Sequence, residues 1–273
     1  MIVYPHSKIN LGLHVIRKRD DEFHELETLF YPLDLCDALE IIPAADGKTE
    51  FTSSGIAIPG NGSDNLCVKA YEILQRDYEL PPVKIHLHKM IPVGAGLGGG
   101  SSDTAFSLKV LNDLYSLKLQ DEKLQHYAQQ LGSDCSFFLG NTPAYATGRG
   151  EILTPYPFSL KSYSLVLVKP DVHISTADAY AGTTPKQPET PLKETLSLPP
   201  EKWKDLLVND FEKTIFRKFP QIAKIKSQLY NMGAVYACMS GSGSSVFGIF
   251  RNKPPADTGK LFAESFVWQQ ELK

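Results

Sequence analysis

The sequence lacks the features that mark several classes of protein. Its four cysteines, Cys36, Cys67, Cys135 and Cys238, are far apart, and none belongs to a CxxC motif or a cysteine–histidine cluster. We therefore expect neither a disulfide framework nor a zinc site. The chain also has no apolar run of membrane-spanning length, and its first residues have no basic leader followed by an apolar core. These absences predict a cytoplasmic protein without a membrane partner.

Neither sign of charge dominates the chain. Lys and Arg together number 28 and Asp and Glu 31, which leaves a net charge of −3 at pH 7. Nucleic-acid partners are not expected, because proteins that bind nucleic acids usually carry a basic excess. Hydrophobic residues make up 42% of the chain and charged residues 22%, as in ordinary folded proteins, so disorder and coiled coil are poor interpretations. Any site for an anion must therefore be local.

Hydrophobic periodicity predicts both strands and helices in the first half of the chain. Alternation from Lys8 to Ile16 predicts a strand that places Lys8 and Asn10 on one face, and a second alternating run covers Val83 to His88. Helical spacing follows in SSDTAFSLKVLNDLYSL and again over residues 121–131, where Gly132 is a stop signal. This half mixes strands with helices.

The second half continues in the same mixed way. AYAT and SYSLVLV predict further strands, and VYACMSGSGSSVFGIF predicts a strand, loop and strand. Residues 183–200 contain five prolines and little pattern, so we expect a surface loop there. The whole chain fits an α+β fold in two domains, residues 1–151 and 152–273.

The most informative segment is PVGAGLGGGSSD, which begins at Pro92. Five glycines in seven residues allow backbone amides to crowd around an anion, and the helix predicted to follow adds the positive end of its dipole. A tight connection without a ligand is the plainer alternative. We favour phosphate binding, by Pro92, Val93, Gly94, Ala95, Gly96, Leu97, Gly98, Gly99, Gly100, Ser101 and Ser102.

Other known phosphate loops fit this segment poorly. The nucleotide-kinase P-loop requires a lysine before its final serine or threonine, and none is present. GAGLGG matches the dinucleotide pattern GxGxxG, but a second helix follows where that fold needs a strand. Protein kinases need HRD and DFG elements, which are missing.

The glycine segment resembles the ATP loop of the GHMP kinase superfamily, which reads Pro, three variable residues, GLG or similar, and SS. Three further segments, SKINLGLHVIRKRDDEFHELETLF, LGSDCSFFL and ATGRGEIL, make the chain similar to those members that phosphorylate a cytidine-diphosphate-linked methylerythritol. With the late SGSGSS loop, the resemblance extends from about Lys8 to Phe250.

The resemblance implies a fold, a reaction and its partners. The N-terminal domain would be like the second domain of ribosomal protein S5, and the C-terminal domain would be ferredoxin-like. The enzyme would transfer the γ-phosphoryl group of ATP to the 2-hydroxyl of the small-molecule alcohol. The sequence itself leaves both a monomer and a homodimer open. Mg²⁺ is expected, with ligands that the sequence does not identify. The alternatives are a GHMP kinase of the homoserine or mevalonate type and an inactive nucleotide-binding relative.

The resemblance also assigns roles to single residues. Asp134 would be the catalytic base, and Lys8 its electrostatic partner. An acidic residue in the first turn of a helix and a surface lysine are the plainer alternatives. Asn10 would hydrogen-bond the methylerythritol part, with an ordinary solvated asparagine as the other possibility.

Three aromatic rings would form the pocket for the base. Phe23 and His24 match a family pair that holds cytosine, and Tyr180 would close the other side. Each aromatic taken alone is more often part of a core. Two positions depart from the family pattern: Glu22 replaces a glycine, which puts the turn geometry in question, and Ser136 stands where proline is frequent. SGSGSS would form either a second anion nest or a plain tight turn.

Overall fold

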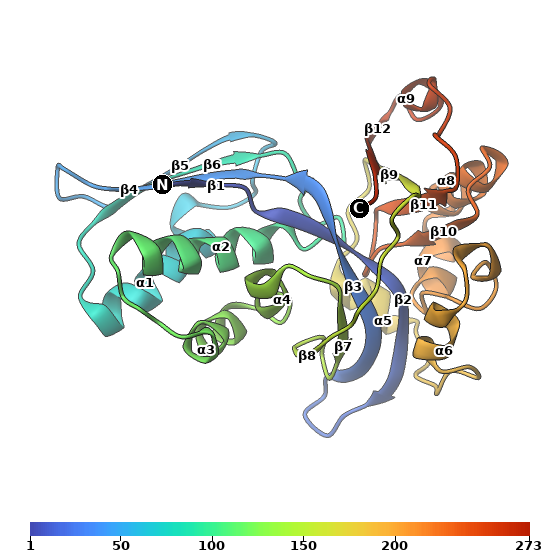
Figure 1. Ribbon diagram of the computed structural model, residues 1–273, viewed down its shortest axis with the longest axis horizontal. Coiled ribbons are helices and arrows are strands. Elements are labelled where there is room, and N and C mark those ends of the chain that lie inside the picture. Colours follow the sequence, from blue (N-terminus) through green and yellow to red (C-terminus); the bar gives the residue numbers. More distant parts are fainter. The chain divides into compact units, whose positions relative to one another are not determined.

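A computed structural model describes all of residues 1–273. The chain divides into two compact units that are discontinuous in sequence. The first unit comprises residues 1–8, 32–93 and 98–142, and the second comprises residues 9–31, 94–97 and 143–273. Each unit mixes strands and helices (Figure 1), which confirms the predicted fold class.

The strands, in chain order, are β1 Ile2–Val3, β2 His6–Lys18, β3 His24–Cys36, β4 Ala38–Pro43, β5 Glu50–Gly55, β6 Val83–Lys89, β7 Ala144–Thr147, β8 Ile152–Pro155, β9 Ser164–Pro170, β10 Tyr236–Met239, β11 Val246–Phe250 and β12 Ser265–Glu271. The α-helices are α1 Leu66–Tyr78, α2 Gly99–Leu114, α3 Asp121–Leu131, α4 Cys135–Gly140, α5 Thr176–Ala181, α6 Leu192–Ser197, α7 Glu212–Lys218, α8 Pro220–Asn231 and α9 Thr258–Leu261. Two 3₁₀ turns, η1 Gly62–Asp64 and η2 Pro200–Lys202, complete the elements. None of the helices combines the length and apolar character needed to cross a membrane.

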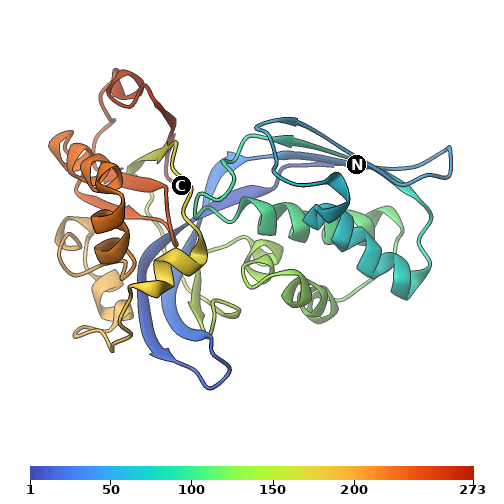
Figure 2. The same ribbon diagram turned by 180° about the vertical axis from the view of Figure 1, so that it is seen from behind.

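The first unit is a sheet with helices packed on one face. The strand order is β1-β4-β6-β5, with β4 antiparallel and β5 parallel to β6. Helices α1 and α2 lie along one face of this sheet in both views (Figures 1 and 2). Alternating residues of the strands, such as Ile85 and Leu87, join Leu108 and Leu111 of α2 in the buried core. The alternating apolar residues of these strands therefore point toward the helices, as the sequence pattern predicts.

The second unit contains a fully antiparallel sheet with the order β10-β11-β9-β12. Val166 and Val168 of β9 pack with Ile225 and Leu229 of α8 in its core. The predicted strand, loop and strand are confirmed as β10 and β11, which pair in antiparallel register around residues 240–245. The late glycine–serine loop is thus held between two core strands.

A third sheet has the order β2-β3-β7-β8. Strand β2 is 13 residues long and continues from the first unit into the second between Lys8 and Ile9. One strand therefore carries both Lys8 and Asn10, as the alternation predicted. Both side chains are buried.

The expected surface loop over residues 183–200 is wrong in part. Helix α6 forms within it, and its Leu192 and Leu196 are buried. These two leucines are four residues apart and lie on one helix face, a signal that the surrounding prolines obscured.

Candidate active site

Lys8 and Asp134 form an ion pair in the first unit. The Nζ atom of Lys8 lies 3.3 Å from an Oδ of Asp134. The side chain of Lys8 is only 4% exposed, whereas that of Asp134 is 30% exposed. The carboxylate therefore has one side on a buried cation and another open to solvent, where a hydroxyl could approach.

The local structure argues against a simple capping role for Asp134. It occupies the N-cap position of α4, but its side chain makes no capping hydrogen bond. A carboxylate at this position normally accepts a hydrogen bond from a backbone N–H of the first turn. The side chain pairs with Lys8 instead.

The start of helix α2 lies beside this pair. A Cβ placed on Gly98, the N-cap residue of α2, would come within 3.2 Å of Cε of Lys8 and within 2.8 Å of the Phe138 ring. Gly98 also has a φ of 70°, which disfavours other residues. The orphan N–H groups of a helix start and a buried ammonium group thus occupy the same region, which suits an anion.

The first part of the glycine segment belongs to the second unit and packs on the late loop. A Cβ on Gly96 would lie 2.0 Å from the backbone oxygen of Ser240, so only glycine fits there. Ser240 Oγ donates to the Gly96 oxygen at 2.9 Å, and the Ser245 amide donates to the Ala95 oxygen at 3.2 Å. The SGSGSS loop therefore supports residues 94–97, a role that the sequence did not indicate.

Asn10 is part of a buried hydrogen-bond network. Its Nδ2 donates to Thr28 Oγ1 at 3.0 Å, and its backbone amide donates to Ser240 Oγ at 3.3 Å. Only 2% of the residue is exposed. The alternative of a solvated asparagine is therefore wrong, because a buried amide held by fixed partners is a positioned group.

His24 and Tyr180 come together in the second unit. Their rings stack with centroids 4.6 Å apart and planes at 24°. Burial, helped by the charge of Lys18, lowers the pKa of His24, so the neutral ring can both donate and accept a hydrogen bond. Tyr180 also packs edge-on against Phe211, which holds its ring.

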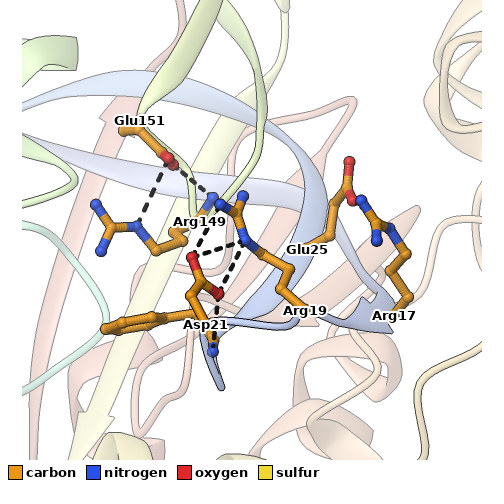
Figure 3. A network of polar contacts seen from close by, with 7 residues as sticks. Arg17, Arg19, Asp21, Glu25, Arg149 and Glu151 are labelled. Atoms are coloured by element: carbon orange, nitrogen blue, oxygen red, sulfur yellow. Dashed lines mark hydrogen bonds and ion pairs between the residues drawn. The ribbon is translucent and has the colours of Figure 1, made fainter.

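Phe23 lies on the exposed turn between β2 and β3. Its ring is 52% exposed, and the guanidinium carbon of Arg149 lies 4.7 Å from the ring centroid. Oε2 of Glu151 accepts a hydrogen bond from the backbone amide of Arg149 at 2.5 Å, and Oε1 of Glu151 lies 3.6 Å from Nε of Arg149 (Figure 3). One face of Phe23 is thus covered by an arginine from ATGRGEIL, a segment whose sequence gave no residue a role.

The turn around Phe23 answers the question raised by Glu22. Glu22 has a φ of 65°, so the turn holds a left-handed backbone conformation with glutamate at this position. Oδ1 of Asp21 accepts a hydrogen bond from the backbone amide of Phe23 at 3.2 Å and another from Nε of Arg19 (Figure 3). At the other departure, Ser136 is buried in α4 and its Oγ has no hydrogen-bond partner.

Sequence reasoning missed a buried ion cluster next to the glycine segment. Lys89 pairs with Asp37 and Asp103, all in the first unit. The only signal in the sequence was that Lys89 in β6 and Asp103 in α2 are charged residues at positions where the hydrophobic pattern predicts a buried core.

The chain offers few protein ligands for a metal ion. No group of three or more His, Cys, Asp or Glu side chains converges on a point. At the start of α2, however, the Oγ of Ser102 is buried without a hydrogen-bond partner. Such a hydroxyl fits Mg²⁺, which usually keeps several waters and takes few protein ligands.

Family models match both halves of the chain. The model described as "GHMP kinases N terminal domain" matches residues 65–146, and that described as "GHMP kinases C terminal" matches residues 196–266.

Individual relatives match over full length. The chain is 52% identical over 276 residues to a protein of Bacteroides fragilis named 4-diphosphocytidyl-2-C-methyl-D-erythritol kinase, with 100% of each chain covered. A protein of the same name from Parabacteroides distasonis is 50% identical over 272 residues, again with full coverage of both. A crystal structure of 4-(cytidine 5'-diphospho)-2C-methyl-D-erythritol kinase superposes with a TM-score of 0.84 at 32% identity, covering 100% of this chain and 99% of that one. A mevalonate kinase structure, with a TM-score of 0.74 at 13% identity, shares the fold.

Proposed function

The chain belongs to the GHMP kinase family, and from this premise we propose that it phosphorylates the 2-hydroxyl of 4-diphosphocytidyl-2-C-methyl-D-erythritol. It is an ATP-dependent phosphotransferase with an alcohol as acceptor. The product is a precursor in the non-mevalonate route to isoprenoids. Relatives named for this activity are 52% and 50% identical to the chain over its full length, which supports the substrate assignment.

The observation that carries the mechanism is the Lys8–Asp134 ion pair beside the start of α2. Asp134 accepts the proton of the substrate hydroxyl while the hydroxyl oxygen forms a bond to the γ-phosphorus of ATP. The bond from that phosphorus to the β,γ-bridging oxygen breaks, and ADP leaves. Lys8 orients the carboxylate and offsets negative charge on the transferred group.

Residues 92–102 hold the phosphates of ATP through backbone amides and the dipole of α2. The Ser102 hydroxyl would be the protein ligand of Mg²⁺, and the ion would offset the charge of ATP. The family models lie within residues 1–151 and 152–273, which supports these as the ATP-binding and C-terminal domains. The four cysteines are free thiols, in keeping with a reducing compartment such as the cytoplasm.

Asn10, Phe23, His24 and Tyr180 bind the cytidyl alcohol in this proposal. Phe23 stacks on the base with the face that Arg149 leaves open, Tyr180 lies on the other side, and the His24 ring reads a polar edge. Asn10 bonds the methylerythritol part. The contact between His24 and Tyr180, which brings these two rings to one place, supports their acting in one pocket.

Release of ADP from Mg-ATP tests the substrate. Turnover with 4-diphosphocytidyl-2-C-methyl-D-erythritol, and none with homoserine or mevalonate, is the expected result. Turnover with either of the other alcohols would transfer the assignment to that kinase type. ATP binding without turnover on any of them would identify a nucleotide-binding relative that is not a catalyst.

Asp134→Asn tests the mechanism. The amide keeps the shape of the side chain but cannot accept the proton, so we expect turnover to fall by a factor on the order of 10² to 10⁴. Binding of Mg-ATP, followed by calorimetry, should stay within about twofold because the amides of residues 92–102 are untouched. Near-normal turnover by this variant would remove Asp134 from the catalytic role.

A further inference from the structure

Lys89, Asp37 and Asp103 form a buried ion triad in the first unit. The Nζ atom of Lys89 lies 2.5 Å from Oδ2 of Asp37 and 2.7 Å from Oδ2 of Asp103. None of the three side chains is more than 4% exposed. The triad joins the loop after β3, the end of β6 and the first turns of α2. No part of the proposed mechanism uses it.

The triad holds both ends of the glycine segment. Asp37 Oδ1 accepts the backbone amides of Met90 at 2.6 Å and Ile91 at 2.8 Å, directly before Pro92. Asp103 follows Ser102 directly, at the other end. Lys89 bonds both carboxylates and so connects the two ends.

The first residue of α2 rests on this triad. A Cβ on Gly99 would lie 3.0 Å from Nζ of Lys89 and 2.9 Å from Cγ2 of Ile91. There is thus no free space in which the helix start could shift toward the strand. The position of the α2 amides follows from the position of the triad.

Stability alone is a weak reason for such a cluster. The desolvation of buried charges can exceed their mutual attraction, and apolar residues of similar size often stabilise a core equally well. Asp103 Oδ1 is buried without a hydrogen-bond partner, which adds a further cost. Directional bonds from one cation to two carboxylates do, however, fix the geometry of the elements that carry them.

We propose that Lys89, Asp37 and Asp103 are positioning residues that fix both ends of the ATP loop and thereby set the affinity for ATP. They do not touch the reacting atoms, so they act on ATP binding and leave the phosphoryl-transfer step unchanged. This inference rests on the proposed function only in taking residues 92–102 as the ATP loop.

Lys89→Met is the direct test, since methionine has similar length and no charge. We expect the dissociation constant and KM for Mg-ATP to rise about tenfold or more, because a loop that is no longer preorganised binds with an added entropic cost. The kcat at saturating ATP and the KM for the alcohol should stay within about twofold. Binding is measured by calorimetry with Mg-ATP alone, well below the unfolding midpoint of each variant.

Lys84→Met is the matched control. Lys84 lies on the same strand and also pairs with two carboxylates, Asp46 and Glu50, but Lys84 is only half-buried and both carboxylates are exposed. This variant should keep the affinity of the unaltered chain for ATP. An equal loss of ATP affinity in Lys84→Met and Lys89→Met would overturn the proposal.

Asp37→Asn provides a second variant if Lys89→Met does not fold. Its amide oxygen can still accept from Met90 and Ile91, while its NH₂ group repels Lys89, so the two ends are uncoupled with little change in shape. We expect the same rise in KM for ATP at unchanged kcat. A purely structural triad would lower the unfolding midpoint of both variants and leave ATP affinity unchanged in every folded one, which would overturn the proposal.

The calorimetry separates this inference from the proposed function. It contains no alcohol, so a wrong substrate assignment leaves the test intact. Failure of the unaltered chain to bind ATP would overturn the proposed function and the triad together. Equal ATP affinity of the unaltered chain and the folded variants would overturn the triad alone.

Discussion

Glu22 holds a backbone conformation that glycine adopts at lower cost. Its φ is 65°, on the turn between β2 and β3 that presents Phe23. We expect Glu22→Gly to raise the free energy of unfolding by about 0.5–1 kcal/mol, because relief of the left-handed strain outweighs the greater freedom of glycine in the unfolded chain. Urea denaturation measures this difference.

The neighbouring Asp20→Gly is the control for that prediction. Asp20 is exposed and is not among the residues with positive φ, so glycine there should lower stability or leave it unchanged. Equal stabilisation by both substitutions would show that the conformation of Glu22 is not the cause.

Arg149 tests how the Phe23 ring is used. If the arginine supports one face while the base stacks on the other, Arg149→Gln should raise the KM for the cytidyl alcohol about two- to fivefold, as loss of an exposed cation–π contact implies. The kcat and the KM for ATP should not change. Arg17→Gln is the control. It removes an exposed ion pair between Arg17 and Glu25, which lie on the two strands that flank the Phe23 turn. A lower KM would mean instead that Arg149 competes with the base for the ring.

At the scale of elements, helix α6 should contribute stability that a loop would not. Leu196 is 3% exposed, and we expect Leu196→Ala to lower the free energy of unfolding by about 2–4 kcal/mol. Leu198, directly after the helix, is 39% exposed, and alanine there should cost much less. Equal effects in urea denaturation would mean that α6 does not pack as described.

The elements that could be predicted are those whose signal is local. The helix over residues 121–131 matches α3, because its apolar spacing and Gly132 lie within one segment. The triad could not be predicted, since Asp37, Lys89 and Asp103 meet only after β4, β6 and α2 have assembled. The contact of Arg149 with Phe23 escaped for the same reason, as the two residues are more than a hundred positions apart.

At the scale of the whole molecule, the pH dependence of stability reflects two sets of carboxyl groups, one with lowered and one with raised pKa values, whose effects on stability have opposite signs. Exposed Asp21 and Asp178 have lowered pKa values through hydrogen bonds to Arg19 and Lys218, so their contribution is lost as the pH falls through those values. Burial raises the pKa of Asp103 to about 7, with Lys89 opposing and Asp37 adding to the shift, and burial also raises the pKa of Glu27. These two groups work in the opposite direction.

The sign for Asp103 follows from proton uptake. Between its ordinary pKa, near 4, and about 7, the folded chain holds this proton more tightly than the unfolded chain does. Stability from this group is therefore complete below about pH 4 and is lost as the pH rises toward 7. Asp103→Asn removes the titration while keeping the shape. We expect the urea midpoint to fall between pH 5 and pH 7 in the unaltered chain and to fall less in Asp103→Asn. Parallel curves would show that Asp103 stays ionised beside Lys89 throughout this range, and the triad would then carry a net negative charge beneath the ATP loop.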